Sequence, residues 1–217
     1  MTPIDYFLTR FLDNTCFQTD AWLVSRELTD AAGPWTDFHS PDDDGEYFCR
    51  VAMHSAQVKF VPDAKTYYRV GNFGSLNNTR SHRAMKALFE SKAKCIRYLL
   101  SMEDSPRTRA AALRLLQDWF PHFYPEHQDI VALAHALAAK LGGTLVKPTL
   151  RWKYRPIEWM LGYEPAMRAS YELPRLRMQA ERKWDECLYR LSRPTASKIE
   201  TPNSQPPTPK GLPADRL

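Results

Sequence analysis

Between residues 79 and 143, apolar residues recur every three or four positions, a spacing typical of amphipathic helices. Ser105-Pro106 places a capping residue before a proline that suits the first helical position. Gly142-Gly143 follows the last of these apolar stripes and predicts the end of its helix. The first stripe consists of Met85, Leu88, Phe89, Cys95, Ile96, Leu99 and Met102. The sequence therefore predicts consecutive helices of unequal length here, without the shared period of a repeat protein.

Residues 1–78 show a mixed pattern. Residues 4–12 have helical spacing behind Thr2-Pro3, and Ser25 can cap a short helix that Gly33-Pro34 ends. Residues 16–24 alternate, and the β-branched and aromatic runs 57–61 and 65–70 flank a Pro62-Asp63 turn, so these three ranges are predicted strands. We therefore expect an α/β region, α+β-like in character, with short strands and short helices.

The C-terminal third divides into two zones. Residues 151–193 hold ten Lys or Arg and six Asp or Glu, interleaved with seven Trp or Tyr residues, and are expected to be helical in pieces. Such a segment can contact a membrane surface, or it can be a solvated helix face whose aromatic side chains pack inward. Residues 194–217 are rich in proline and poor in apolar side chains, which predicts a disordered tail. The expected domains are thus 1–78, 79–193 and 194–217.

Composition narrows the function classes. The chain has 217 residues, 43% of them hydrophobic, and a formal net charge of +5. No apolar run is long enough to span a membrane, and no signal peptide is apparent, so a cytoplasmic protein is expected. The four cysteines lie far apart and are expected to be buried free thiols rather than zinc ligands. The basic residues of 151–193 are too diluted by acids to predict nucleic-acid binding.

The acidic run Asp42-Asp43-Asp44 admits three interpretations. Its carboxylates can cap a helix N-terminus, bind a divalent cation, or provide a general base. A calcium loop is disfavoured because no further ligands follow at EF-hand spacing. The run alone does not choose between capping and catalysis.

The segments around this acidic run, taken together with it, resemble a known protein family. The segments AWLVSRELTDAAGPW (21–35), DDDGEYFCRV (42–51) and VKFVPDAKTYYRVGNFGS (58–75) occur in the order and spacing of one family. They resemble the acceptor-side, C-terminal half of bacterial family-2 glycosyltransferases of the GT-A fold. The resemblance is strongest over residues 15–80 and looser up to about 193. It implies a partial GT-A sheet, followed by a mainly helical C-terminal region.

The resemblance also implies roles for individual residues. Asp44 corresponds to the carboxylate that deprotonates the acceptor hydroxyl in an inverting transfer, with Asp43 beside it to orient the acceptor or the helix. Arg50 corresponds to an arginine at the helix end with a structural role. The substrate-binding residues that it implies are Trp22, Trp35 and Asp37 on the acceptor side, and Arg69, Asn72 and Ser75 in a loop over the donor diphosphate.

The sequence departs from the family at its N-terminal side. The nucleotide-binding βαβ half, with the DxD motif that holds a divalent metal (Mg or Mn) in the family, has no counterpart here. We therefore expect a glycosyltransferase fragment that is inactive alone or depends on a missing donor-binding half. Its implied partners are a nucleotide sugar and a glycan acceptor.

The alternative is a non-catalytic helical adaptor or a peripheral membrane-binding protein that uses residues 151–193, which would place it at the inner face of the membrane. Unpaired sheet edges in an isolated half would also lead to self-association.

Overall fold

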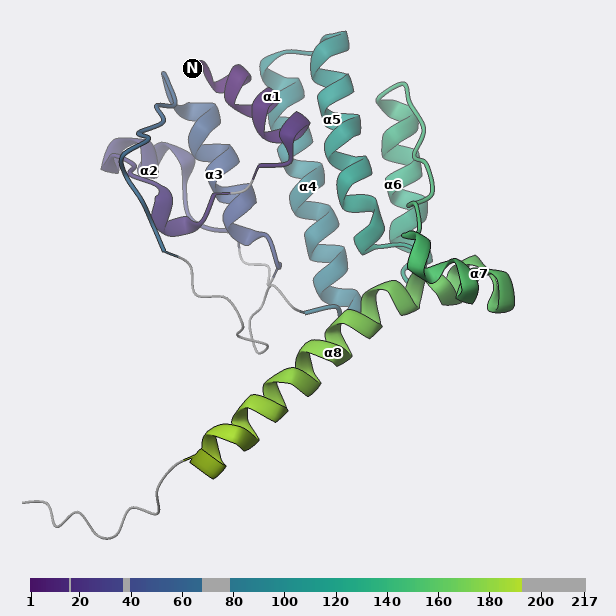
Figure 1. Cartoon of the computed structure of the whole chain (residues 1–217). Coiled ribbons are helices and arrows are strands. Elements are labelled where there is room, and N and C mark those ends of the chain that lie inside the picture. Colours follow the sequence, from purple (N-terminus) through teal and green to yellow (C-terminus); the bar gives the residue numbers. More distant parts are fainter. Residues whose placement is uncertain (16, 37–39, 68–78, 193–217) are drawn as a thin grey trace, which may run out of the picture. The chain divides into compact units, whose positions relative to one another are not determined.

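The computed structural model describes residues 1–15, 17–36, 40–67 and 79–192, and every regular element in these ranges is a helix (Figure 1). The α-helices are α1 (Pro3–Asp13), α2 (Arg26–Ala32), α3 (Asp43–His54), α4 (His82–Met102), α5 (Pro106–Trp119), α6 (Gln128–Lys140), α7 (Arg155–Leu161) and α8 (Tyr163–Ser192). Short 3-10 turns are η1 (Thr19–Ala21), η3 (Phe120–His122) and η4 (Trp152–Tyr154).

The predicted α/β class with a partial GT-A sheet is therefore wrong for the described residues, which contain no strand. Residues 17–24 form η1 and irregular chain, and residues 55–67 are irregular apart from a turn. In the second range, Val58 exchanges two backbone hydrogen bonds with Met1, at 3.0 and 2.9 Å. A β-prone run needs a partner strand along its length, and these segments have none among the described residues.

The helix predictions, in contrast, are confirmed. Thr2 caps α1 with Pro3 at its start, and Ser25 caps α2, which ends at Gly33. Ser105 caps α5 ahead of Pro106 in the predicted manner. Side-chain oxygens at these positions accept bonds from backbone amides that the first turn leaves without partners.

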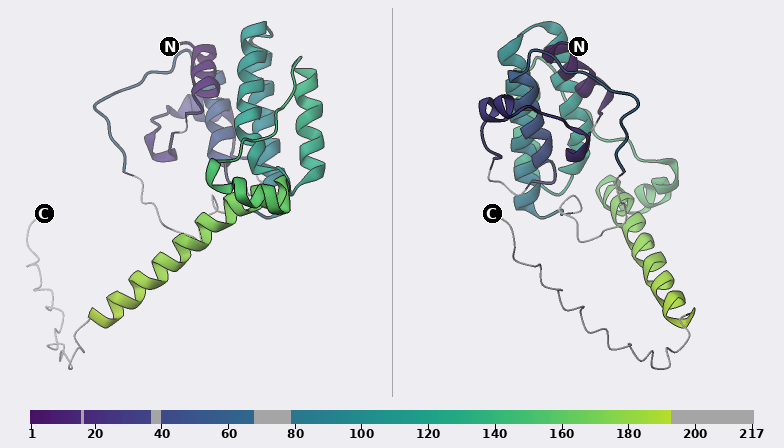
Figure 2. Two further views of the ribbon diagram at one scale, coloured as in Figure 1. Left: turned by 45° about the vertical axis from the view of Figure 1, so that its right-hand side comes forward. Right: turned by 90° about the vertical axis from the view of Figure 1, so that its left-hand side faces the viewer.

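The chain divides into two compact units, Met1–Met167 and Arg168–Leu217. In the first unit α4 is central, since it contacts α1, α3, α5 and α6. Figures 1 and 2 show α3, α4, α5 and α6 running alongside one another. The fully buried core side chains include Phe7, Phe11, Met85, Leu88, Ile96, Leu99, Leu116, Phe120, Phe123 and Ile130. This unit includes residues 1–78 together with much of 79–193, and α3 packs on α4 within it.

The second unit contains most of α8, a 30-residue helix with Pro174 in its interior. Its buried residues, Ala166 and Met167, lie before the division between the units. None of the helices in the described ranges is both long enough and apolar enough to cross a membrane. The predicted disordered tail, 194–217, lies outside the described residues.

Candidate functional site

The acidic run forms the start of α3, so Asp43 and Asp44 stand in its first turn. Carboxylates are favoured there because the helix macrodipole is positive at its N-terminal end. Asp44 N donates to Asp43 Oδ1 at 2.9 Å, and Gly45 N donates to Asp44 Oδ1 at 2.8 Å. Both carboxylates are partly exposed. The first turn of α3 therefore presents two carboxylates whose positions are fixed by backbone amides.

Asp42 has a different role from its two neighbours. It occupies the N-cap position, but its side chain makes no capping bond. Instead Asp42 Oδ2 lies 2.6 Å from Lys92 Nζ, and Ser91 Oγ donates to the same oxygen at 3.1 Å. The Asp42 and Lys92 side chains are 5% and 3% exposed. This buried ion pair, which we call the Asp42–Lys92 pair, fixes the start of α3 against α4.

Two further features hold this end of α3. Lys92 Nζ lies 3.8 Å from the centre of the Trp119 ring, a cation–π contact to α5. Gly45 is required beside the pair, because a side chain there would collide with the Asp42 carboxylate.

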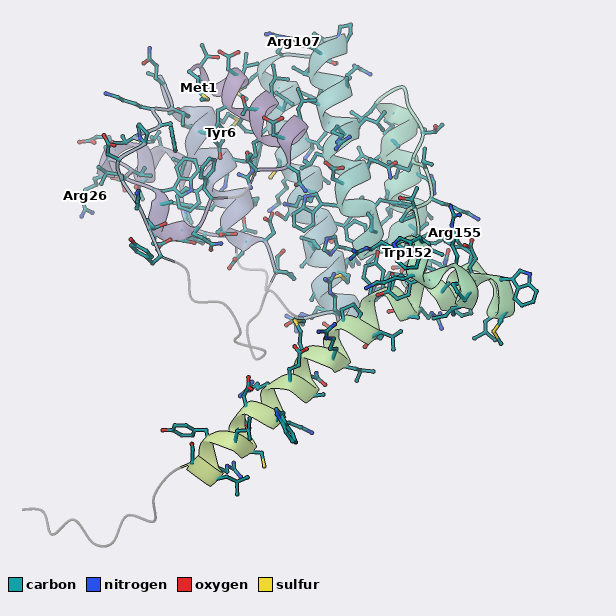
Figure 3. The ribbon with its side chains drawn as sticks, in the orientation of Figure 1. Met1, Tyr6, Arg26, Arg107, Trp152 and Arg155 are labelled. Atoms are coloured by element: carbon teal, nitrogen blue, oxygen red, sulfur yellow. The ribbon has the colours of Figure 1, made fainter. Side chains whose placement is uncertain are left out.

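Arg10 of α1 also holds this turn of α3. Its guanidinium is buried and donates to Gly45 O at 3.3 Å, to Tyr6 Oη at 3.3 Å and to Cys49 Sγ at 3.5 Å. Figure 3 labels Tyr6, whose side chain comes from α1. α1 and α4 together therefore fix the position from which the carboxylates of Asp43 and Asp44 project.

Asp44 has an altered acidity. Its pKa is raised above the ordinary aspartate value, first by burial and then by the nearby negative charge of Asp42. The positive charge of Arg10 acts in the opposite direction and is outweighed. Thr19 Oγ1 donates to Asp44 Oδ2 at 3.4 Å, which connects η1 to α3. A carboxylate with a raised pKa binds a proton more strongly than an ordinary aspartate does.

Glu46, also in the first turn of α3, forms a second polar network with Arg50, one turn further along. Glu46 is 1% exposed and accepts bonds from Tyr98 Oη at 2.6 Å, Thr36 Oγ1 at 2.9 Å and Arg50 Nε at 2.9 Å. Arg50 also donates to the backbone carbonyls of Ala32 and Pro34. These contacts fix the segment after α2 against α3 and α4, which is a structural use of Arg50.

Trp22 and Trp35 both pack on aromatic side chains of α3. The Trp22 ring stacks on Phe48 with centroids 4.5 Å apart, and the Trp35 ring stacks on Tyr47 at 4.4 Å. The Phe48 and Trp35 rings also pack in a T-shaped arrangement, with centroids 6.1 Å apart. Trp35 remains 43% exposed, whereas Trp22 is partly buried and its Nε1 has no hydrogen-bond partner among the described residues. The structure thus brings both tryptophans to the helix that carries Asp43 and Asp44.

The remaining predicted site residues, Asp37, Arg69, Asn72 and Ser75, lie outside the described residues. Within the described ranges, no group of three or more His, Cys, Asp or Glu side chains is arranged to hold a metal ion. Cys49 and Cys95 are buried free thiols as predicted, the prediction of burial is wrong for Cys187, which is exposed, and Cys16 lies outside the described residues.

Sequence reasoning missed three residues of the site: Arg10, Glu46 and Lys92. Lys92 had a detectable signal, since it falls four positions after Leu88 and three before Cys95, within the apolar stripe of its helix. A lysine on a buried stripe needs a partner for its charge. The identity of that partner, fifty residues earlier in the chain, depends on the tertiary fold.

Comparison with known proteins gives no relative: no family model, curated protein or solved structure matches this chain.

Proposed function

We propose that this chain provides the acceptor side of an inverting glycosyl transfer, in which Asp44 accepts the proton of the acceptor hydroxyl. The observation that carries the proposal is the state of Asp44, a partly exposed carboxylate in the first turn of α3 with a raised pKa. A general base works best when its pKa approaches the operating pH and its position is fixed. Arg10 and the Asp42–Lys92 pair fix that position.

Trp35 supports an acceptor site on the same helix. Its ring is held by stacking on Tyr47 and is still 43% exposed. A flat aromatic face can pack against a sugar ring, and a side chain already fixed by its neighbour loses little freedom when the sugar binds. Asp43, partly exposed beside Asp44, would accept a second hydroxyl hydrogen bond and orient the acceptor.

The proposal assigns the sugar donor and its metal to another part of the assembly. Every regular element of the described residues is a helix, and we assign the nucleotide sugar to a donor-binding partner or to additional polypeptide. In this arrangement the chain contributes the base and the acceptor surface, and transfer depends on the donor-binding part.

Acceptor binding gives a direct test that does not require the donor. The full chain is titrated with methyl glycosides of glucose, galactose, mannose and N-acetylglucosamine while tryptophan fluorescence is recorded. We expect saturable binding of at least one glycoside, lost in Trp35→Ala and retained in Trp159→Ala, an exposed tryptophan on α7. Asp44→Asn should keep glycoside binding. It should also remove the part of the pH dependence of the binding affinity that comes from protonation of the Asp44 carboxylate.

The genomic DNA upstream of the Met1 codon provides an independent check. We expect it to encode a βαβ segment with a DxD motif, in frame or as a neighbouring gene. Failure of every glycoside to bind, together with absence of such a segment, would disprove the proposal.

A second candidate function is a non-catalytic helical adaptor, which α8 favours. After Met167, its apolar side chains are largely exposed, including Leu173, Trp184 and Leu191 at 47%, 65% and 77%. An adaptor would bind its partner through α8 and would be insensitive to Asp44→Asn. Trp184→Glu should abolish that binding, so the two variants separate the two functions.

A further inference from the structure

Residues Arg151–Leu161, which comprise Arg151, η4 and α7, expose an unusual concentration of apolar surface. Trp152 and Trp159 are 81% and 88% exposed, and Met160 and Leu161 are 72% and 66% exposed. In this segment, Tyr154 is the buried side chain. A tryptophan presents 150–250 Å² of largely apolar surface, roughly, and soluble proteins usually cover a group of such side chains.

The same eleven-residue segment is basic. It contains Arg151, Lys153 and Arg155 against the single acid Glu158. All three basic residues are exposed. Figure 3 labels Trp152 and Arg155, which lie close together where η4 leads into α7. Apolar and cationic side chains are therefore presented by the same short stretch of chain.

From these observations we propose that the segment Arg151–Leu161, here called the α7 tip, docks on an anionic lipid membrane surface. Tryptophan is favoured at the boundary between lipid headgroups and acyl chains, where its ring is buried and its N–H stays among polar groups. Basic side chains beside it are attracted to the negative surface potential of anionic lipids. Both parts of the α7 tip are matched by this one type of partner.

The arrangement of the apolar side chains argues against a protein groove. A helix that binds in a groove presents apolar residues three and four positions apart, along one stripe. Trp159, Met160 and Leu161 are consecutive, so they spread over roughly 200° around the end of α7. Gly162 follows directly, with a φ of 90° that ends the helix. A fluid lipid layer can surround such an end, whereas a groove would contact only part of it.

The charge of the α7 tip argues against a second copy of this chain. A symmetric dimer through this face would place Arg151, Lys153 and Arg155 against the same three cations of the other copy. Each copy offers only Glu158 in return. Like charges brought together at an interface oppose association.

Vesicle co-sedimentation of the full chain tests the proposal. The probes are vesicles of phosphatidylcholine alone and of phosphatidylcholine mixed with phosphatidylglycerol. We expect binding to the mixed vesicles that weakens as salt is added and is much weaker on the neutral ones. Trp152→Ala/Trp159→Ala should lower the partition coefficient by at least about tenfold. Arg151→Ala, Lys153→Ala and Arg155→Ala should each lower it by about fivefold.

A matched control removes two exposed aromatic residues elsewhere. Phe60 and Tyr67 are 67% and 90% exposed, and Phe60→Ala/Tyr67→Ala should leave vesicle binding unchanged. Circular dichroism verifies that each variant keeps its helices. Three outcomes would overturn the proposal: no vesicle binding, equal binding to neutral vesicles, or binding unaffected by Trp152→Ala/Trp159→Ala. Sedimentation velocity tests the alternative that the α7 tip binds a second copy of this chain. Conversion of a dimer to a monomer by Trp152→Ala/Trp159→Ala would identify that second copy as the partner.

Discussion

The Asp42–Lys92 pair holds two opposite charges in the interior, next in the chain to Asp43 and Asp44, the two partly exposed carboxylates of α3. Removing one member of a buried pair leaves the other charge without compensation, which typically costs about 3–5 kcal/mol. Lys92→Met should therefore lower the free energy of unfolding by about that amount, as measured by urea titration with circular dichroism. Loss of the contact with the Trp119 ring adds to the effect.

Two further variants make this prediction specific. Lys86→Met, at an exposed position of the same helix, should change stability by less than about 0.5 kcal/mol. Adding Asp42→Asn to Lys92→Met removes the unpaired charge and should restore part of the loss. If Lys92→Met were as stable as Lys86→Met, the pair would have no role in fixing the start of α3.

His122 predicts a stability change with pH. Burial first, and then the charge of Arg80, lower its pKa to about 4, and Arg80 Nη1 lies 2.5 Å from His122 Nδ1. Above pH 6.5 the ring is neutral in both the folded and the unfolded chain. Between about pH 6.5 and 4 the unfolded chain binds a proton that the folded chain does not, so stability falls with acidification, by up to about 3 kcal/mol.

Urea unfolding at several values between pH 7 and pH 4 measures this dependence. His122→Asn keeps a hydrogen-bond acceptor for Arg80 and should remove this part of the pH dependence. The exposed His135 provides the control, since His135→Asn should leave it in place. Asp44 acts in the opposite sense, because a raised pKa favours the folded state as pH falls. The difference in pH dependence between His122→Asn and the parent protein therefore gives the contribution of His122. Identical curves of unfolding free energy against pH for the two proteins would contradict this role of His122.

The individual residues of the site differ in how well sequence could predict them. Asp43 and Asp44 lie in the first turn of a helix, a position that agrees with one of the three interpretations of the acidic run, since carboxylates are favoured at a helix N-terminus. Asp42 belongs to the same run of three, yet it turns inward to Lys92. That difference depends on a lysine fifty positions away and on the space left by Gly45. Neither can be derived from the acidic run itself.

The helix predictions were correct and the strand predictions were wrong for the described residues, because helix caps find their partners nearby in the chain and strands do not. The caps of α1 and α5, Thr2 and Ser105, lie within three residues of the amides that they satisfy. A strand depends on partners that can be anywhere in the chain. The runs 57–61 and 65–70 have β-prone composition, but in the described part of the chain only Val58 finds such a backbone partner, at Met1. Composition was therefore insufficient evidence for a sheet.

α4 determines how the elements around the site are arranged. It provides Ser91 and Lys92 to Asp42 at the start of α3, and Tyr98 to Glu46 in the first turn of α3. Both networks lie along the contact between α3 and α4, which also buries Cys49 and Cys95. The side of α3 that faces α4 is therefore fixed at two levels, while Asp43 and Asp44 remain partly exposed.

The whole chain combines a packed helical unit with a helix that exposes apolar surface. Self-association was expected from unpaired sheet edges, but the described residues form no sheet. The exposed apolar side chains of α8 provide a different reason to expect self-association. Leu173, Ala180 and Cys187 follow one another at heptad spacing, as do Trp184 and Leu191, which places them along one side of the helix. Unlike the α7 tip, α8 is nearly balanced in charge, with six Lys or Arg and five Asp or Glu.

We therefore predict that two copies of the chain associate through α8. Sedimentation velocity over a range of concentrations should show a reversible dimer, because pairing would cover side chains such as Trp184 and Leu191. Trp184→Glu/Leu191→Glu should weaken dimerisation by more than about tenfold, since each carboxylate would be buried without a partner. Trp152→Ala/Trp159→Ala, on the α7 tip, should leave the dimer intact. If the chain stays monomeric at every concentration, α8 does not pair with itself. Its apolar face would then bind a different partner.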